Sequence, residues 1–185
     1  SSADLKITAH KIKISKTFDN STSCSSENSL VIIDSVYDKL IEALENEGGA
    51  LLSPEEKKIL GNKMWNENHI LNRKIIAKEA SEIAISVGLD KIKFSNSKFL
   101  MVEENGIGED YPFSKEKLSP VLAVYRARDF NHAVKLTKKI LQNQGQGHSC
   151  SIHSKNEDNI TKLGMELPVC RVIVNQAHCF ATGGS

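Results

Sequence analysis

Short apolar runs alternate along this chain with segments whose apolar residues recur at helical spacing. The apolar runs have the length of buried strands and lie at residues 30–33, 98–103, 121–126, 148–153 and 170–174. The helical segments begin after Asp34 and Asp129, or cover residues 73–87 and 157–166. Strands that alternate with helices bury a sheet between helical layers. The sequence therefore predicts an α/β architecture.

Capping residues mark several boundaries of these elements. Ser53-Pro54-Glu55-Glu56 predicts a helix start, because Ser53 can cap, Pro54 fits the first turn and Glu56 completes a capping box. Asp34 and Asp129 are expected N-caps, and Gly88 is expected to end the helix of residues 73–87. The polar stretch 105–117 predicts a surface loop. The opening residues fit a strand or a helix equally well.

The composition is typical of a soluble globular protein of one domain. The 185 residues include 39% hydrophobic and 25% charged residues, with a formal net charge of +1. No basic block indicates a nucleic-acid partner or a membrane surface. No apolar run reaches the roughly 18 residues that a membrane span needs. The four cysteines form no C-x-x-C pair, which favours a reducing, cytoplasmic location.

Cys24 lies in a polar loop of small residues that leads into the first strand. Small neighbours let a substrate reach the sulfur and let backbone N–H groups point at a developing oxyanion. A thiolate is the most nucleophilic side chain near neutral pH when its surroundings favour it. The local pattern leaves two interpretations open: a catalytic nucleophile, or a loop thiol with no task.

His148 begins a strand in the sequence Gly147-His148-Ser149-Cys150. It is either a polar residue at a strand start or half of a Cys/His pair. His148, Cys150 and His153 also invite a metal site. Side chains alternate along a strand, however, so His153 would point away from the other two, and no carboxylate completes a tetrahedral site. We assign no metal ligand.

Glu116 precedes the strand of residues 121–126 at a proline turn, where a glutamate is ordinarily a solvated charge. The chain has no Gly-x-Gly-x-x-Gly and no Walker-type loop. Gly106-Ile107-Gly108 lacks the third glycine and the strand-to-helix setting of such a loop. The sequence therefore predicts no nucleotide-binding unit within this chain.

Taken in order, several blocks of residues resemble the CoA-acylating aldehyde dehydrogenases, a family that includes the aldehyde halves of bifunctional aldehyde–alcohol dehydrogenases. Each block is weak alone, but their order and spacing are specific and favour the catalytic interpretation of Cys24. The blocks are Ser15-Lys16-Thr17-Phe18-Asp19-Asn20, Cys24-Ser25-Ser26-Glu27, residues 116–127, Gly147-His148-Ser149-Cys150, residues 171–176 and Gly183-Gly184.

The resemblance implies an aldehyde-dehydrogenase-type catalytic domain over residues 1–185, with an open, mostly parallel sheet flanked by helices. It also implies that the NAD-binding domain belongs to a longer parent chain. A start without methionine and an end at Gly183-Gly184-Ser185 fit such a piece, which is expected to be inactive alone. The parent is expected to be a homo-oligomer in the cytoplasm or inside a bacterial microcompartment.

The resemblance further assigns roles to three residues. Cys24 would attack a small aldehyde to give a thiohemiacetal, and its backbone N–H would help hold the oxyanion. Hydride would pass to NAD (or NADP), and coenzyme A would take the acyl group from the thioester on Cys24. Glu116 matches the glutamate that contacts the nicotinamide ribose. His148 matches a histidine expected to move protons for the thiol or CoA.

The substrate and two other classes of function stay open. Residues 175–180 are more similar to the sulfoacetaldehyde-oxidising branch, with acetaldehyde and succinate semialdehyde as alternatives. A cationic or multi-donor pocket would suit an anionic aldehyde. A stand-alone thioester hydrolase or acyltransferase would use Cys24 and His148, with Asn175 as orienter. A non-catalytic scaffold domain is the third possibility.

Overall fold

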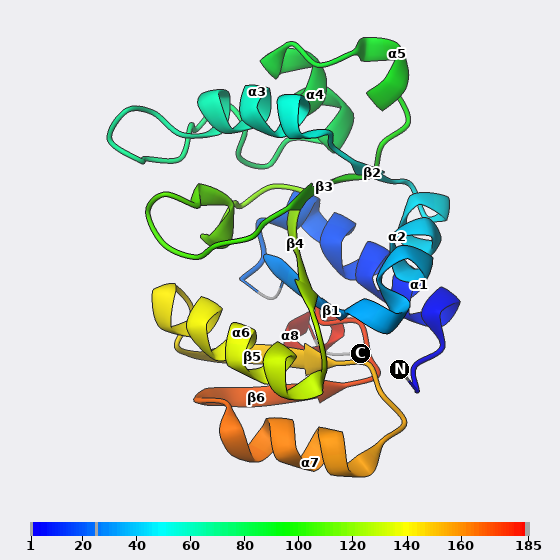
Figure 1. The fold of residues 1–185 in the computed structure, drawn as a ribbon. Coiled ribbons are helices and arrows are strands. Elements are labelled where there is room, and N and C mark those ends of the chain that lie inside the picture. Colours follow the sequence, from blue (N-terminus) through cyan, green and yellow to red (C-terminus); the bar gives the residue numbers. More distant parts are fainter. Residues whose placement is uncertain (1, 25, 184–185) are drawn as a thin grey trace.

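The computed structural model describes residues 2–24 and 26–183, so Ser25 and Gly184 of the matched blocks lie outside the described residues. Its main sheet is parallel throughout, in the order β1-β4-β3-β2 (Figure 1). The strands are β1 (Ser29–Ile33), β2 (Gly49–Leu51), β3 (Phe99–Glu103) and β4 (Val121–Ala127). The central strands β3 and β4 are buried along nearly their whole length, as a parallel sheet covered on both faces requires. The prediction of an open, parallel sheet flanked by helices is confirmed.

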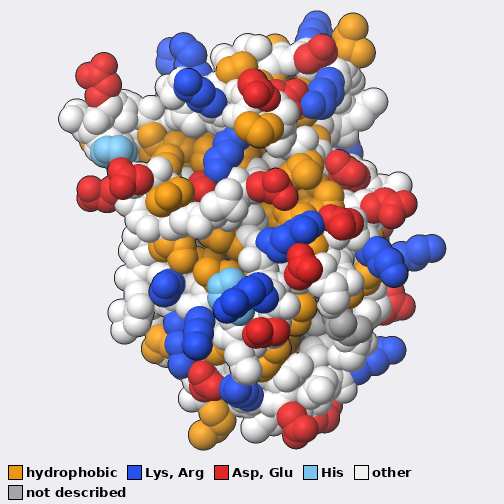
Figure 2. All heavy atoms as spheres, in the orientation of Figure 1, with side chains coloured by type: hydrophobic (Ala, Val, Ile, Leu, Met, Phe, Trp, Pro, Cys, Tyr) orange, Lys and Arg blue, Asp and Glu red, His pale blue; other side chains and the backbone are white. Residues whose placement is uncertain are grey.

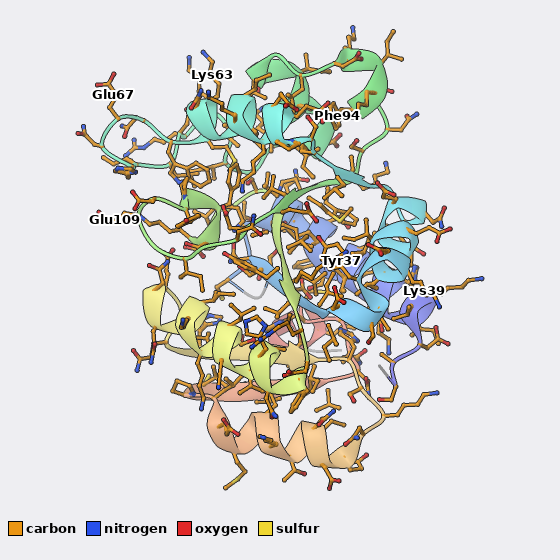
Figure 3. The ribbon with its side chains drawn as sticks, in the orientation of Figure 1. Tyr37, Lys39, Lys63, Glu67, Phe94 and Glu109 are labelled. Carbon is orange, nitrogen blue, oxygen red and sulfur yellow. The ribbon has the colours of Figure 1, made fainter. Side chains whose placement is uncertain are left out.

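Helices cover both faces of this sheet. One core cluster packs α1 (Leu5–Thr17) and α2 (Tyr37–Asn46) against it. On the other face lie α3 (Pro54–Met64), α4 (Ala80–Val87) and α5 (Lys91–Phe94). Figure 3 labels Tyr37 of α2 and Phe94 of α5, whose rings are buried in these two separate clusters.

A smaller unit follows the main sheet. The parallel strands β5 (Gly147–Ile152) and β6 (Val169–Val174) form a sheet of their own between α6 (Phe130–Asn143) and α7 (Glu157–Glu166). Figure 1 shows α6, the strand pair and α7 stacked down the view. The short α8 (Phe180–Gly183) comes last, and 3-10 turns lie at Phe18–Ser21, Asp34–Val36 and Pro112–Ser114.

Most predicted boundaries are observed. The capping box at Ser53 forms, with the Ser53 hydroxyl accepting from the Glu56 N–H and the Glu56 carboxylate accepting from the Ser53 N–H. Asp129 caps α6, and Gly88 ends α4 with a left-handed φ of 92°. The ambiguous opening segment is a helix, capped by Asp4. Asp34, by contrast, begins a 3-10 turn, and α2 starts only at Tyr37.

Two expectations are wrong in part. The helix expected over 73–87 starts only at Ala80, because Ala77 has a left-handed φ of 60° and its N–H donates to Leu118 O. The stretch 105–117 lacks regular structure apart from one turn, yet it is not confined to the surface. Lys117 is fully buried there and donates to the carbonyls of Phe113 and Lys115 at 2.8 and 2.7 Å.

The surface carries charges of both signs. Figure 2 shows acidic and basic side chains interspersed over one face without a large region of one sign. Among the described helices, none has the length and apolar character to span a bilayer.

Candidate active site

Each of the three predicted site residues lies at, or a few residues before, the amino-terminal end of a parallel strand. Cys24 precedes β1, Glu116 precedes β4, and His148 is the second residue of β5. Because β1 and β4 are parallel neighbours, the segments that lead into them lie side by side. Asn28 joins these segments, since its Oδ1 accepts from the Lys117 N–H at 3.1 Å and its carbonyl oxygen accepts from the Ala123 N–H at 3.1 Å. The amino-terminal edge of the sheet therefore brings Cys24 and Glu116 together.

A single pocket collects all three residues. Its cavity volume is about 690 Å³, within the range of small-molecule sites. Cys24, Glu116 and His148 all line it, and each has an exposed side chain. The sulfur of Cys24 thus lies at a solvent-accessible wall rather than in the core. Helix α6 contributes further wall residues, because it connects β4 to β5.

The loop before Cys24 has an unusual backbone. Asp19, Asn20 and Ser21 are consecutive non-glycine residues with left-handed φ values of 48°, 48° and 61°. Such residues each cost about 1–3 kcal/mol and occur where the surroundings fix them, often at functional sites. Asn20 Nδ2 donates to Ala77 O at 3.2 Å, and the Ser21 hydroxyl donates to the Lys16 carbonyl. These contacts fix the path of the chain into the nucleophile loop.

A buried acid and a buried base lie next to this loop. Lys16 and Glu27 are 1% and 9% exposed, and Lys16 Nζ donates to the Glu27 carbonyl at 2.7 Å. Burial raises the pKa of Glu27 and lowers that of Lys16, while their mutual attraction opposes both shifts. Glu27 also lines the pocket, and its Oε2 has no hydrogen-bond partner. Burial beside the pocket therefore favours the uncharged form of the Glu27 carboxyl.

The other cysteines differ from Cys24. Cys150 also lines the pocket, but burial raises its pKa to about 11, so it is a poor nucleophile at neutral pH. Cys179 is buried. Cys170 is exposed outside the pocket lining and donates to His148 O at 2.9 Å. Cys24 is the exposed pocket cysteine in the described part of the chain.

Glu116 and Asn175 each make hydrogen bonds that define their place in the structure. The Glu116 N–H donates at 2.7 Å to Oε1 of Gln144, which joins the loop before β4 to the end of α6. Asn175 binds the backbone of Ser154 through both ends of its amide, at 2.8 and 2.7 Å. His148 Nδ1 contacts the Ser149 hydroxyl at 2.9 Å instead. Asn175 therefore does not orient His148, which removes the orienter that a Cys/His/Asn hydrolase requires.

The metal interpretation of the sequence and the glycine pair at Gly106 can each be compared with the structure. No group of three or more His, Cys, Asp or Glu side chains among the described residues could hold a metal ion. Gly106, within the glycine pair noted in the sequence, packs against the Tyr111 ring, and its carbonyl accepts from Tyr125 Oη at 3.2 Å. A side chain at position 106 would collide with that ring, so packing explains this glycine.

Sequence reasoning missed several residues that border this site. Lys16, Glu27 and Ser149 lie inside blocks that resemble the family, but nothing local distinguished them. His178 follows β6 and becomes part of the pocket only when β6 pairs with β5. The signal available for Lys16, Glu27 and Ser149 was the family match, whereas His178 depends on tertiary contact.

The chain is similar in sequence and in structure to several known proteins. No family model matches the chain. The chain is 50% identical over 184 residues to a sulfoacetaldehyde dehydrogenase (acylating) of Cupriavidus necator, covering 100% of this chain and 37% of that protein. It is 35% identical to a bifunctional aldehyde–alcohol dehydrogenase of Escherichia coli, over 94% of this chain and 19% of that protein. A crystal structure of an acetylating aldehyde dehydrogenase from Geobacillus thermoglucosidasius superposes with a TM-score of 0.93 at 36% identity, covering 97% of this chain and 39% of that one.

The fold and the sequence thus agree on one class: over nearly its whole length the chain is similar to acylating aldehyde dehydrogenases. Within that class it has half of its residues in common with the Cupriavidus sulfoacetaldehyde dehydrogenase. It spans about two fifths or less of the length of these relatives.

Proposed function

We propose that this chain is the catalytic cysteine domain of an NAD-dependent, CoA-acylating aldehyde dehydrogenase, and that the parent enzyme carries the cofactor domain. The observation that carries the proposal is the common pocket of Cys24, Glu116 and His148. Glu116 and His148 are 92 and 124 positions beyond Cys24 in the sequence. The match to acylating enzymes over nearly the whole chain supports the same conclusion.

The nucleophilic step belongs to Cys24. Its thiolate forms a bond to the aldehyde carbon, and the carbonyl oxygen becomes the thiohemiacetal oxyanion. The backbone N–H of Cys24 donates to that oxyanion. Bound NAD would supply the hydride acceptor for this carbon. Loss of the hydride would restore the carbon–oxygen double bond and leave a thioester on Cys24.

Acyl transfer completes the cycle. His148 takes the proton from the thiol of coenzyme A, whose sulfur then adds to the thioester carbon. The Cys24 sulfur leaves and recovers the proton from His148, and acyl-CoA departs. Release of that proton to solvent restores the Cys24 thiolate. The thioester intermediate divides the oxidation and the acyl transfer into separate steps.

The residues present fit one end of the nicotinamide cofactor. Glu116 has an exposed carboxylate at the same pocket as Cys24, so it can accept hydrogen bonds from ribose hydroxyls. The chain has no glycine-rich phosphate-binding sequence. The phosphates and the adenine (of NAD or NADP) therefore require the second domain of the parent.

The proposed substrate is a small anionic aldehyde such as sulfoacetaldehyde, with acetaldehyde and succinate semialdehyde as the alternatives. The described pocket lining contains hydroxyl, amide and imidazole donors but no lysine or arginine. Of the two kinds of anion site considered, it offers only the multi-donor kind, and the carboxyls of Glu27 and Glu116 also lie at its wall. The 50% identity to a sulfoacetaldehyde dehydrogenase favours the same substrate.

Two further features of the parent are proposed. It acts in a reducing cytoplasm, or in a microcompartment within it, because no disulfide occurs among the described residues. It forms a homo-oligomer, as the family resemblance implies.

The test is a steady-state assay of the complete enzyme with sulfoacetaldehyde, acetaldehyde and succinate semialdehyde, each with and without coenzyme A. We expect sustained NADH formation only when CoA is present, with the highest kcat/KM for sulfoacetaldehyde. Equal sustained turnover without CoA would refute the acylating assignment. A higher kcat/KM for a neutral aldehyde would refute the anionic substrate alone.

A further inference from the structure

A serine hydroxyl links two histidines at the wall of the pocket. Ser149 Oγ lies 2.9 Å from His148 Nδ1 and 2.8 Å from His178 Nε2. Ser149 belongs to β5, and His178 belongs to the loop after β6. The parallel pairing of β5 with β6 brings these segments together. All three side chains line the pocket that also contains Cys24.

The two imidazoles have different surroundings. His148 is exposed, whereas His178 is 7% exposed. Burial lowers the pKa of His178 to about 4, and the neighbouring His148, Arg171 and His153 add to the effect. At neutral pH His178 is therefore uncharged and retains one acceptor nitrogen. Glu27 is the acidic neighbour, since its carboxylate accepts from the His178 backbone N–H.

The number of available hydrogens fixes the direction of both hydrogen bonds when His148 is protonated. In an imidazolium both ring nitrogens carry hydrogen, so His148 Nδ1–H must donate to Ser149 Oγ. The Ser149 hydroxyl then has only its own hydrogen to give, and it donates to His178 Nε2. A neutral His178 accepts that bond without adding a second positive charge.

We propose that Ser149 and His178 are positioning residues for His148: they hold its ring so that Nε2 faces the reacting thiol, and they stabilise the imidazolium that forms there. This inference rests on the proposed role of His148 as proton acceptor in acyl transfer. A hydrogen bond to a charged group is stronger than one between neutral groups. The two hydrogen bonds that run from His148 through Ser149 to His178 form a relay. This relay therefore favours the protonated state of His148 over its neutral state.

Hydrogen bonds hold the chain segments on both sides of His178. The Asn175 amide binds both backbone groups of Ser154, and the Asn175 N–H donates to Ile152 O at 2.9 Å. On the other side of His178, the Cys179 N–H donates to Ser15 Oγ at 3.1 Å. These contacts hold the backbone on both sides of His178, which supports a positioning role for its side chain.

Protons balance across the relay. The proton that His148 Nε2 takes from the CoA thiol is returned to the departing sulfur of Cys24. Ser149 and His178 exchange no net proton with solvent. Their contribution is greatest while His148 carries charge, which is the period of acyl transfer and not of hydride transfer.

The test uses the complete enzyme and separates the two half-reactions. A burst of NADH without CoA reports hydride transfer, and single-turnover discharge of the acyl-enzyme by CoA reports acyl transfer across pH. For Ser149→Ala and His178→Leu we expect discharge to slow about tenfold. We also expect an unchanged burst, because hydride transfer does not charge His148. Ser149→Thr and His178→Gln should restore most of the rate, because each keeps the required hydrogen-bonding group.

Ser86→Ala is the matched control, since its hydroxyl makes a comparable bond to Ile83 O on α4, away from the pocket. Wild-type discharge in Ser149→Ala, with slow discharge in His148→Ala, would overturn the relay and leave the proposed function intact. Wild-type discharge in His148→Ala would instead overturn the role of His148 itself. Equal loss of burst and discharge in Ser149→Ala, with no rescue by threonine, would reduce Ser149 to a structural residue. That result would also overturn the relay.

Discussion

Lys16 Nζ donates a hydrogen bond of 2.7 Å to the backbone carbonyl of Glu27, and both side chains are buried beside the loop of Cys24. The lysine comes from the end of α1, while the glutamate comes just before β1. Their contact ties the helix that covers one face of the sheet to the segment that carries the nucleophile. The loop is thus held by the core as well as by its own short-range hydrogen bonds.

Lys16→Met tests this link. Methionine has a similar length but no donor, so the buried Glu27 carbonyl loses its hydrogen-bond partner. We expect the free energy of unfolding to fall by about 2 kcal/mol, measured by urea unfolding at pH 8. Lys6→Met on the exposed face of α1 is the matched control and should change stability little. An equal effect of the two substitutions would contradict the structural role of Lys16.

The pH dependence of stability tests the setting of His178. Its pKa is lowered from 6.5 to about 4, mainly by burial. Its contribution to stability is therefore complete above pH 6.5 and is lost as pH falls through about 4. The full loss corresponds to about 3 kcal/mol. His178→Gln should flatten the decline in stability between pH 6.5 and pH 4. An unchanged slope in His178→Gln would show that the buried imidazole does not resist protonation.

Asn175 tests the support of the loop after β6. Its φ of 53° is left-handed, a conformation that asparagine and glycine adopt more readily than alanine. Asn175→Ala removes two hydrogen bonds and adds backbone strain, so we expect a loss of about 3 kcal/mol. Asn175→Gly removes the same bonds without the strain and should lose about 2 kcal/mol. Thermal unfolding of both variants makes the comparison, and an alanine variant as stable as the glycine variant would contradict the strained backbone.

Much of the fold follows from local signals. The capping box at Ser53, the cap at Asp129 and the apolar run of β4 each specify their element without distant partners. The first half of the segment 73–87 could not be predicted in this way. Its apolar spacing is helical, but Ile75 is buried by tertiary packing and Ala77 takes a left-handed φ that binds the loop before β4.

The site likewise contains residues that the sequence indicated and contacts that it did not. The family match indicated Cys24, Glu116 and His148, and the parallel order of the strands explains why they share a pocket. The contacts around them join distant segments, such as Cys179 with Ser15 at a separation of 164 residues. Side-chain partners at such separation leave no periodic trace in a single sequence.

Expression of residues 1–185 alone tests the division into domains. The chain has core clusters on both faces of its sheet, so we expect a cooperative unfolding transition. We also expect no NADH formation, since the phosphate-binding part of the cofactor site is assigned to the parent. Circular dichroism and an NADH assay make the measurement. Turnover by residues 1–185 would show that the cofactor domain is dispensable.

The most direct measurement of the central claim is the mass of the acyl-enzyme. The complete enzyme is mixed with aldehyde and NAD in the absence of CoA, quenched in acid, digested and analysed by mass spectrometry. We predict one acyl group, as a thioester on the peptide that contains Cys24, which disappears when CoA is added before the quench. Acylation of Cys150 or Cys170 in its place, or undiminished NADH formation by Cys24→Ser, would contradict the account.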